Sequence, residues 1–344
     1  MNNVVLPAEW APQSAIMLTW PHADTDWAPI LDDVERVYRD LAVAIGLRQP
    51  VLISCEDADR LPQIQAYLRN AGVPDNHVKL YQVPADDTWA RDHGPITVYR
   101  EGAPVLLNFR FNAWGGKFES SKDDRINGEL AKQGAFGNSQ VQDVDFILEG
   151  GSIESDGQGT LLTTSACLLT DTRNSEQTQQ DIEANLKQLL GVQQVLWLHH
   201  GHLAGDDTDS HVDTLARICD PQTICYVRCE DETDPHYAAL NAMEAELRAF
   251  RTLAGEPYRL VPLPMPTAQF GPEGDRLPAT YANFLIMNDA VLVPTYGVPE
   301  DETALNILQG CFPDREIVAI NCRPLIEQHG SLHCVTMQIP AGVL

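Results

Sequence analysis

The order strand–strand–helix–strand recurs along this chain, and this recurrence constrains the fold more than any other feature of the sequence. Apolar patterns predict the order in two segments, residues 146–198 and residues 283–338. A chain of 344 residues has room for about five such units. One unit cannot bury a core alone, so we expect consecutive units to pack together in a repeat architecture. The units share no sequence identity, so a mixed α/β domain of another topology is the alternative, and both interpretations place residues 1–344 in one domain.

Hydrophobic periodicity predicts where the elements lie. Apolar residues at helical spacing predict helices over residues 32–47, 61–70, 122–132, 175–190, 235–253 and 302–310, with 235–253 the longest. Alternating or continuous apolar runs predict strands over residues 15–20, 51–54, 78–83, 96–99, 195–198, 211–218, 283–287, 291–294, 317–321 and 331–338. In the strand predicted at 211–218, period two places His211 and Asp213 on the same face.

The formal net charge of −26, from 23 Lys and Arg against 49 Asp and Glu, disfavours two classes of partner. Nucleic acids and anionic membranes both require a basic surface, whereas small cations are attracted to an acidic one. No apolar run approaches the roughly 18 residues that span a bilayer, and the first residues lack the layout of a signal peptide. We therefore expect a cytoplasmic protein.

Residues 199–213 hold four histidines and four aspartates without any lysine or arginine. Three interpretations compete for this stretch: a divalent metal site, a pocket for an organic cation, and a solvated acidic loop. A metal-dependent hydrolase would use His199, His200, His202, Asp206 and Asp209, although their spacing matches no zinc signature. For Asp206 and Asp207, solvation is as good an interpretation as binding.

Two further stretches carry candidate binding residues. Trp89, Arg91 and Asp92 precede the strand predicted at 96–99. They form either a surface salt bridge or an aromatic and a carboxylate that grip a flat cation. Glu149 is predicted at a strand end before a Gly-Gly turn.

Cysteines offer one candidate nucleophile. The eight cysteines include no Cys-x-x-Cys pair, so most are expected to be reduced and buried. Cys334 follows His329 and His333, and imidazolium neighbours would lower the pKa of its thiol. A packing role in the strand predicted at 331–338 is the alternative.

Over nearly its full length the chain resembles the agmatine deiminases and bacterial peptidylarginine deiminases, members of the guanidine-modifying group. The resemblance rests on LPAEWAPQ, WARDHGP, FRFNAWGGK, LEGGSIESDGQGTLLTT, GDDTDSHVDTLARI, NFLIMNDAVLVPTYGVPEDETALNILQ and GSLHCVTMQIP, in this order. It implies a five-bladed α/β propeller, the pentein fold, and a hydrolase that needs neither a cofactor nor a metal ion.

Matched motif by motif, the resemblance also implies roles for individual residues. Cys334 would be the nucleophile, His211 the general acid/base, Asp92 and Asp213 the clamps of the guanidinium, and Glu149 a further orienting carboxylate. Trp89, Trp114 and Asp207 would join Asp92 and Asp213 in binding the substrate. The positive charge of the substrate would favour the thiolate, so Cys334 need not be ionised in the free enzyme.

The resemblance favours agmatine as the substrate and polyamine metabolism as its setting. Peptidylarginine enzymes place arginines for the substrate carboxylate where this chain reads 112–116, NAWGG. Agmatine deiminases usually read GGGN where this chain has 328–331, QHGS, so substrate choice is the open question, and peptidyl or free arginine is the alternative. A non-enzymatic polyamine-binding protein is a further alternative, and a homo-oligomer is possible.

Overall fold

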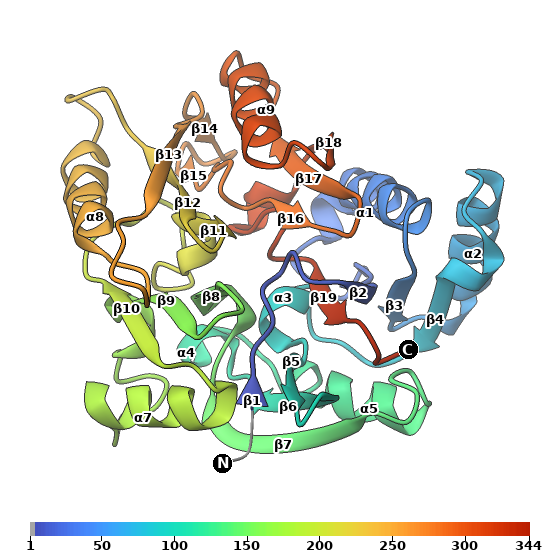
Figure 1. The fold of residues 1–344 in the computed structure, drawn as a ribbon. Coiled ribbons are helices and arrows are strands. Elements are labelled where there is room, and N and C mark those ends of the chain that lie inside the picture. The colour runs from blue at the N-terminus through green and yellow to red at the C-terminus, as the bar shows by residue number, and fades with distance from the viewer. Residues whose placement is uncertain (1–3) are drawn as a thin grey trace.

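The computed structural model describes residues 4–344, and within this range five sheets of three or four strands are arranged in a ring (Figure 1). The longer helices lie on the outside of the ring (Figure 1). No helix within residues 4–344 combines the length and the apolar character needed to cross a membrane.

The first sheet contains both an early and a late part of the chain. Its order is β19-β2-β3-β4, and β19 runs antiparallel to β2 whereas the other pairs are parallel. The elements are β2 (Gln13–Thr19), α1 (Leu31–Gly46), β3 (Val51–Cys55), α2 (Leu61–Asn70), β4 (Val78–Gln82) and β19 (Met337–Pro340).

The other four sheets repeat one pattern, an antiparallel pair followed by a helix and a third strand parallel to the second. In chain order they are β5 (Ile96–Arg100), β6 (Ala103–Arg110), α5 (Ile126–Lys132), β7 (Gln140–Ile147); β8 (Ile153–Ser155), β9 (Thr160–Thr164), α7 (Gln179–Leu190), β10 (Gln194–Leu198); β11 (Ala216–Asp220), β12 (Thr223–Arg228), α8 (Tyr237–Ala249), β13 (Arg259–Pro264); and β16 (Leu285–Ile286), β17 (Ala290–Thr295), α9 (Glu300–Cys311), β18 (Glu316–Asn321).

Short elements connect these units. β1 (Val4–Val5) pairs with β5, and β14 (Gln269–Phe270) pairs with β15 (Arg276–Leu277). The short α-helices are α3 (Ala90–His93), α4 (Ala113–Gly116) and α6 (Ser165–Leu168). The 3₁₀ turns are η1 (Ala28–Ile30), η2 (Ala58–Arg60), η3 (Asp75–His77), η4 (Asp123–Arg125), η5 (Gly150–Ser152), η6 (Val212–Thr214) and η7 (Leu325–Gln328).

Two apolar clusters form the core, and β2 is buried between them. Ile16 and Leu18 pack in one cluster, while Ala15 and Met17 pack in the other. A strand with both faces buried reads as a continuous apolar run, which is the pattern of residues 15–18.

The sequence correctly predicts a mixed α/β fold and the strand–strand–helix–strand order in both segments. β8, β9, α7 and β10 fill the first segment, and β16, β17, α9 and β18 fill most of the second. The longest helix, however, is α1 with 16 residues, not the helix predicted at 235–253, which is α8 with 13.

Two predicted strands are wrong, and side-chain hydrogen bonds explain both errors. At 211–218 the chain forms η6 before β11, because Thr214 Oγ1 donates to the carbonyl of His211 at 2.8 Å and bends the backbone. At 331–338 the strand begins only at Met337, because Asn283 Oδ1 accepts the backbone N–H groups of His333 and Cys334 in place of a sheet partner.

Candidate active site

Cys334 is held in a turn just before β19. The Asn283 side chain fixes this turn by accepting from the N–H of His333 at 2.8 Å and the N–H of Cys334 at 3.2 Å. The Cys334 thiol lies 3.4 Å from the same oxygen, and the Cys334 carbonyl accepts from the N–H of Arg91 at 3.1 Å. The turn is therefore tied both to the segment before β16 and to α3.

Cys334 lies in the wall of a pocket. Aromatic and acidic side chains make most of its wall: Trp89, Trp114, Phe118, Asp26, Asp87, Asp92 and Asp207, with Thr208 and residues 328–330. A Cβ on Gly330 would lie 2.0 Å from the Trp89 ring, so a glycine is needed for the indole to lie against this backbone. The segment 328–330, where the sequence departs from the agmatine deiminase pattern, thus forms part of the wall.

Asp92, His211 and Asp213 meet around Gly151. A Cβ on Gly151 would lie 2.6 Å from His211 Nδ1, 2.8 Å from Asp92 Oδ1 and 3.1 Å from Asp213 Oδ2. The Asp92 Oδ1 and His211 Nδ1 atoms are 3.6 Å apart. The four residues come from α3, η5 and the turn at η6, which connect β4 to β5, β7 to β8 and β10 to β11, so three connections between consecutive sheets meet at one point.

Two donors hold the Asp92 carboxylate. The N–H of Gly151 donates to Oδ1 and the indole Nε1 of Trp114 donates to Oδ2, each at 3.0 Å. Trp114 reaches Asp92 from a turn in which Ala113 and Trp114 have φ of 49° and 57°. Positive φ is costly for these residue types, and such strain is commonly found where a side chain must be aimed at a functional site.

Three buried polar atoms at this point have no hydrogen-bond partner among residues 4–344. They are both ring nitrogens of His211 and Oδ1 of Asp213. Buried polar atoms are nearly always paired in folded proteins, so unpaired ones beside Asp92, which lines the pocket, indicate a place for a polar ligand.

Burial and neighbouring charges shift the pKa values of Asp92, Asp213 and His211 in different directions. Burial, together with Asp213 and Glu149, raises the pKa of Asp92 to about 6 against the opposing effect of His211. Burial also acts to raise the pKa of Asp213, but hydrogen bonding and charge from His333 outweigh it and lower that pKa. Desolvation works against charge on His211, yet Asp92 and Cys167 raise its pKa well above the usual value.

The pKa of the Cys334 thiol is raised, which corrects the expectation that histidine neighbours lower it. Burial is the main cause, and the charges of Asp213 and Asp92 add to it. The two histidines that were expected to act on the thiol bind other groups. The ring of His333 contacts Asp213 and Glu9, both at 2.7 Å, and His329 Nδ1 contacts the carbonyl of Gly205 at 2.7 Å.

The remaining predicted residues divide between the pocket and its support. Glu149 is fully buried behind it, and both of its oxygens accept from Arg173 Nε, at 2.9 and 3.0 Å. Asp207 lines the pocket, and burial raises its pKa to about 6 while the charge of His329 opposes the rise. Arg91 and Asp92 are both buried, so the surface salt bridge is excluded.

The donors of the metal-hydrolase alternative do not form a common group within residues 4–344. His199 contacts Ser165 Oγ at 3.0 Å and His200 contacts Glu246 at 2.7 Å, and both histidines are exposed. Asp206 instead stabilises its own turn by accepting from Thr208 and Ser210.

The family model for the Porphyromonas-type peptidyl-arginine deiminase matches residues 5–340. The chain belongs to this family. It is a deiminase, an enzyme in the class of hydrolases that act on amidine carbon–nitrogen bonds.

Individual relatives of the deiminase cover almost its whole length. A Selenomonas ruminantium protein provisionally named agmatine deiminase is 34% identical over 99% of this chain and 96% of its own. A Porphyromonas gingivalis structure provisionally named arginine deiminase is 49% identical, with a TM-score of 0.92 over 98% of this chain and 99% of its own. The C. jejuni agmatine deiminase, as a cysteine-to-serine variant with substrate bound, is 36% identical, with a TM-score of 0.91 over 98% of this chain and 96% of its own.

The fold of the deiminase extends beyond this family. The inosamine-phosphate amidinotransferase of Streptomyces griseus is 13% identical, with a TM-score of 0.54 over 99% of this chain and 98% of its own. A likeness at this identity concerns the mixed α/β fold alone.

Four residues of the site have no counterpart among the sequence-based predictions for the deiminase. They are Gly151, Asn283, Arg173 and Cys167, of which the last has its sulfur within 4.8 Å of donor atoms of Glu149 and His211. Only Gly151 carries a local signal, since it follows Glu149 in a Gly-Gly turn that a side chain would obstruct. The others become important only through contacts made by distant segments.

Proposed function

We propose that this deiminase hydrolyses agmatine to N-carbamoylputrescine and ammonia. The observation that carries the proposal is the pocket wall, which combines two indoles with four aspartates and, among residues 4–344, includes no lysine or arginine. Indole faces and carboxylates suit a cation that is flat at one end. Agmatine is cationic at both ends, so Asp207 is a partner for its amine while Asp92 and Asp213 hold its guanidinium.

Cys334 is the proposed nucleophile. A guanidinium is planar, so carboxylates at its edges leave the central carbon open to attack from one face. Because the pKa of the Cys334 thiol is raised by burial and by the two aspartates, the thiol is neutral in the free enzyme. A bound guanidinium offsets the charge of Asp92 and Asp213, so in the complex the thiol loses its proton to solvent and the thiolate forms beside the protonated His211.

The proposed reaction has two halves joined by a covalent intermediate. The thiolate adds to the guanidinium carbon, His211 gives a proton to one nitrogen, and that nitrogen leaves as ammonia. An amidino group then remains on the sulfur of Cys334. Water adds to its carbon while His211 takes a proton from the water, and the carbon–sulfur bond breaks to release the carbamoyl product and the cysteine. Glu149, held by Arg173, is the further orienting carboxylate of the site, and its charge supports the protonated form of His211.

Arginine compounds are the second candidate substrates, because the family model and the P. gingivalis relative carry arginine deiminase names. The test is an ammonia-release assay with agmatine, free arginine and a peptidyl-arginine ester at equal concentration. We expect agmatine to have the highest kcat/KM, since the carboxylate of free arginine finds no lysine or arginine in the pocket wall. An inert agmatine together with turnover of an arginine compound would assign the substrate to the second class.

A metal-dependent hydrolase and a non-enzymatic polyamine-binding protein are disfavoured by specific observations. Two of the three histidines that the first would need, His199 and His200, are paired with Ser165 and Glu246 at the surface. The second would need the aspartates but neither the thiol nor His211, whose ring nitrogens face the same point. The proposed mechanism uses no metal ion and no cofactor.

At the level of the fold, we propose that the five sheets are the blades of an α/β propeller and that residues 1–344 form one domain, of which residues 1–3 lie outside the described part. The ring of Figure 1 and the pairing of β19 with β2 support both statements. A cytoplasmic location, a role in polyamine metabolism, a homo-oligomeric state and the lack of nucleic-acid or membrane partners stay predictions.

A further inference from the structure

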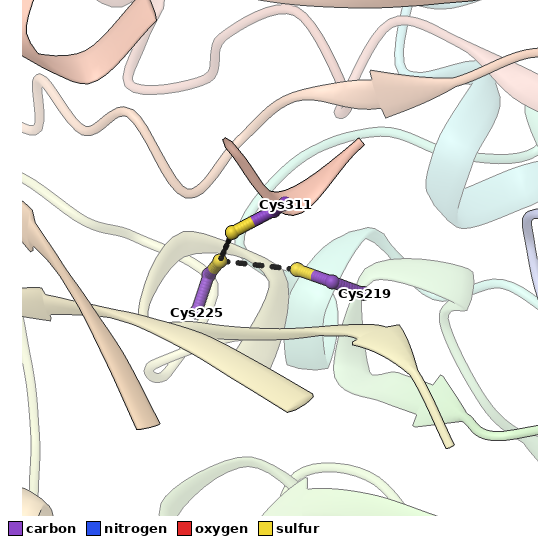
Figure 2. Close-up of side chains that lie close together, drawn as sticks. All are labelled: Cys219, Cys225 and Cys311. Carbon is purple, nitrogen blue, oxygen red and sulfur yellow. Dashed lines mark hydrogen bonds between the residues drawn. The ribbon is translucent and has the colours of Figure 1, made fainter. Parts of the chain in front are cut away.

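Three cysteines lie together outside the candidate active site. Cys219 is in β11, Cys225 is in β12, and Cys311 is the last residue of α9. Figure 2 shows the three side chains pointing toward one another. Their sulfurs are separated by 3.0 Å between Cys219 and Cys225 and by 3.5 Å between Cys225 and Cys311, and all three lie within 4.8 Å of one another.

Local structure accounts for the position of each sulfur. The register of β11 against β12 shifts between Ile218 and Asp220, so Cys219 lies at a bulge and has no direct partner on β12. A bulge redirects the side chain of the extra residue, and here the Cys219 sulfur reaches the Cys225 sulfur. α9 packs against β13, the neighbour of β12, which brings its C-terminal end to the same place.

The separations suit a metal ion better than a disulfide. The sulfurs of a disulfide are about 2.05 Å apart, whereas three thiolates around a tetrahedral ion with metal–sulfur bonds of about 2.3 Å are roughly 3.8 Å apart. All three cysteines are free thiols, and opening the cluster by less than 1 Å would admit an ion.

We propose that Cys219, Cys225 and Cys311 form a binding site for a thiophilic d¹⁰ metal ion, zinc or copper(I), that clamps α9 to the β11–β12 hairpin. The donor set contains sulfur alone, which selects these ions over magnesium or calcium. The site joins two neighbouring sheets of the ring, because α9 connects β17 to β18 whereas the hairpin belongs to the sheet of β13.

Access and charge at the site are compatible with an ion. Cys219 and Cys225 are buried, but Cys311 is only partly buried and gives the ion an entry path. The guanidinium of Arg259 is near enough to Cys311 to act on its charge. Arg259 would also offset the negative charge of three thiolates around a divalent ion.

The test is a titration of the full chain, carrying Cys334→Ala so that the pocket thiol cannot contribute. Protein is reduced and freed of metal without oxygen, then titrated with cobalt(II), whose thiolate complexes absorb strongly in the near ultraviolet. Parallel arms use zinc and copper(I) in competition with chromophoric chelators. We expect one ion per chain, with the tighter-bound ion of the two arms as the physiological candidate.

Two variants compare the metal affinity of the chain with and without a cysteine of the cluster. Cys311→Ser, at a partly accessible helix end, should lower affinity by roughly 100-fold or more, whereas Cys55→Ser, at a buried cysteine away from the cluster, should leave it unchanged. In the chain with its native Cys334, Cys311→Ser should keep turnover and lose the rise in Tm that the ion produces. Binding that survives in both Cys311→Ser and Cys225→Ser, no binding in any arm, or a Cys219–Cys225 disulfide in protein prepared without oxygen would overturn the proposal.

Discussion

The Cys334 thiol faces two carboxylates and an amide instead of a cation. In many thiol enzymes a neighbouring imidazolium or a helix N-terminus lowers the pKa of the cysteine, so a reactive thiolate is always present. Here the pKa is raised, and the cation that offsets it is the proposed substrate. Such a thiol stays neutral and weakly reactive until the substrate binds in the pocket. It is therefore protected from alkylation and oxidation in the free enzyme.

Replacing Cys334 by alanine tests the proposed nucleophile. We expect Cys334→Ala to lower kcat by about 10⁴-fold or more, because the covalent route is lost, while agmatine still binds to Asp92 and Asp213. Ammonia release and calorimetry measure the two effects. Cys322→Ser is a matched control, because Cys322 is a buried cysteine that does not line the pocket, and it should retain turnover.

The intermediate can be tested on the wild-type chain as part of the same prediction. Protein quenched in acid during turnover should carry an amidino adduct on the peptide that contains Cys334. An adduct on another cysteine, or an alanine variant that turns over at the normal rate, would assign the chemistry to a different thiol.

The pKa of Asp92, about 6, predicts an acid limb in the pH profile. Below that pH the carboxyl is neutral and cannot hold a guanidinium as an ion pair, so kcat/KM should fall up to tenfold per pH unit. In the complex the bound cation lowers the pKa of Asp92, so the fall in kcat should begin at a lower pH than the fall in kcat/KM.

A change of Trp114 identifies the group that titrates in that profile. The indole of Trp114 donates to Asp92, and this hydrogen bond lowers the pKa of the carboxyl. In Trp114→Phe the acid limb of kcat/KM should therefore move to higher pH. A limb that keeps its position would mean that another group controls it.

At the scale of elements, η5 decides the geometry of the site because its second glycine leaves room for three side chains. Gly151→Ala would place a methyl group within 2.6 to 3.1 Å of His211, Asp92 and Asp213, and these groups would have to move. We expect activity to fall about 100-fold, since misplacement by 1 Å has that effect, and stability to fall by about 1–3 kcal/mol.

Gly128→Ala in α5 is the matched control for this prediction. A Cβ there meets nothing within 4 Å and the backbone is helical, so turnover should be unchanged and stability equal or up to about 1 kcal/mol higher. Urea denaturation and the ammonia assay give both readouts. Equal activity in the two variants would show that the space at Gly151 is not needed.

Elements with strong periodicity are the ones that the sequence locates well. α2 spans the predicted 61–70, since its apolar positions repeat at helical spacing and Pro62 lies in its first turn, where proline is tolerated. The strand predicted at 211–218 fails because its alternation comes from polar residues, His211, Asp213 and Thr214, that are buried by contacts with other segments. In such a case an alternation with period two does not indicate a strand.

The site divides in the same way. Motifs name five residues of the site: Cys334, His211, Asp92, Asp213 and Glu149. In the structure Asp92, His211 and Asp213 meet around Gly151, Glu149 lies near His211, and Cys334 lines the pocket with Asp92. Asn283 and Arg173 could not be named, because each acts on a residue more than twenty positions away in sequence. No local pattern records such a pairing.

At the scale of the whole molecule, Arg217 connects segments from several sheets. Its side chain is fully buried, with Nε 2.5 Å from Glu154, Nη2 2.9 Å from Glu9, and Nη1 donating to the carbonyl of Ala282 at 3.0 Å. Glu9 also contacts His333, which precedes Cys334. One buried ion network thus joins β11 and β8 to the segments that precede β2, β16 and β19.

Removing Arg217 should destabilise the whole fold. Arg217→Met leaves Glu154 without its main cationic partner and removes one of several cationic partners of Glu9, and breaking a buried pair costs about 3–5 kcal/mol. The control is Arg36→Met, whose exposed pair with Asp33 should change stability by less than about 1 kcal/mol. Chemical denaturation measures both, and equal stability of the two variants would contradict the central role of the network.

The pairing of β19 with β2 has a consequence for protein synthesis. Met17 pairs with Met337, so the ribosome must add 320 residues (337 − 17) before the edge of β2 finds its partner. An unpaired apolar edge invites wrong partners during that interval, and this sheet is the last of the five that can be completed. Cys334 is translated three positions before β19, so the thiol arrives together with the strand that completes the first sheet. A nascent chain therefore holds every aspartate of the pocket before it holds the sulfur, and a chain that ends before residue 334 lacks both β19 and the proposed nucleophile.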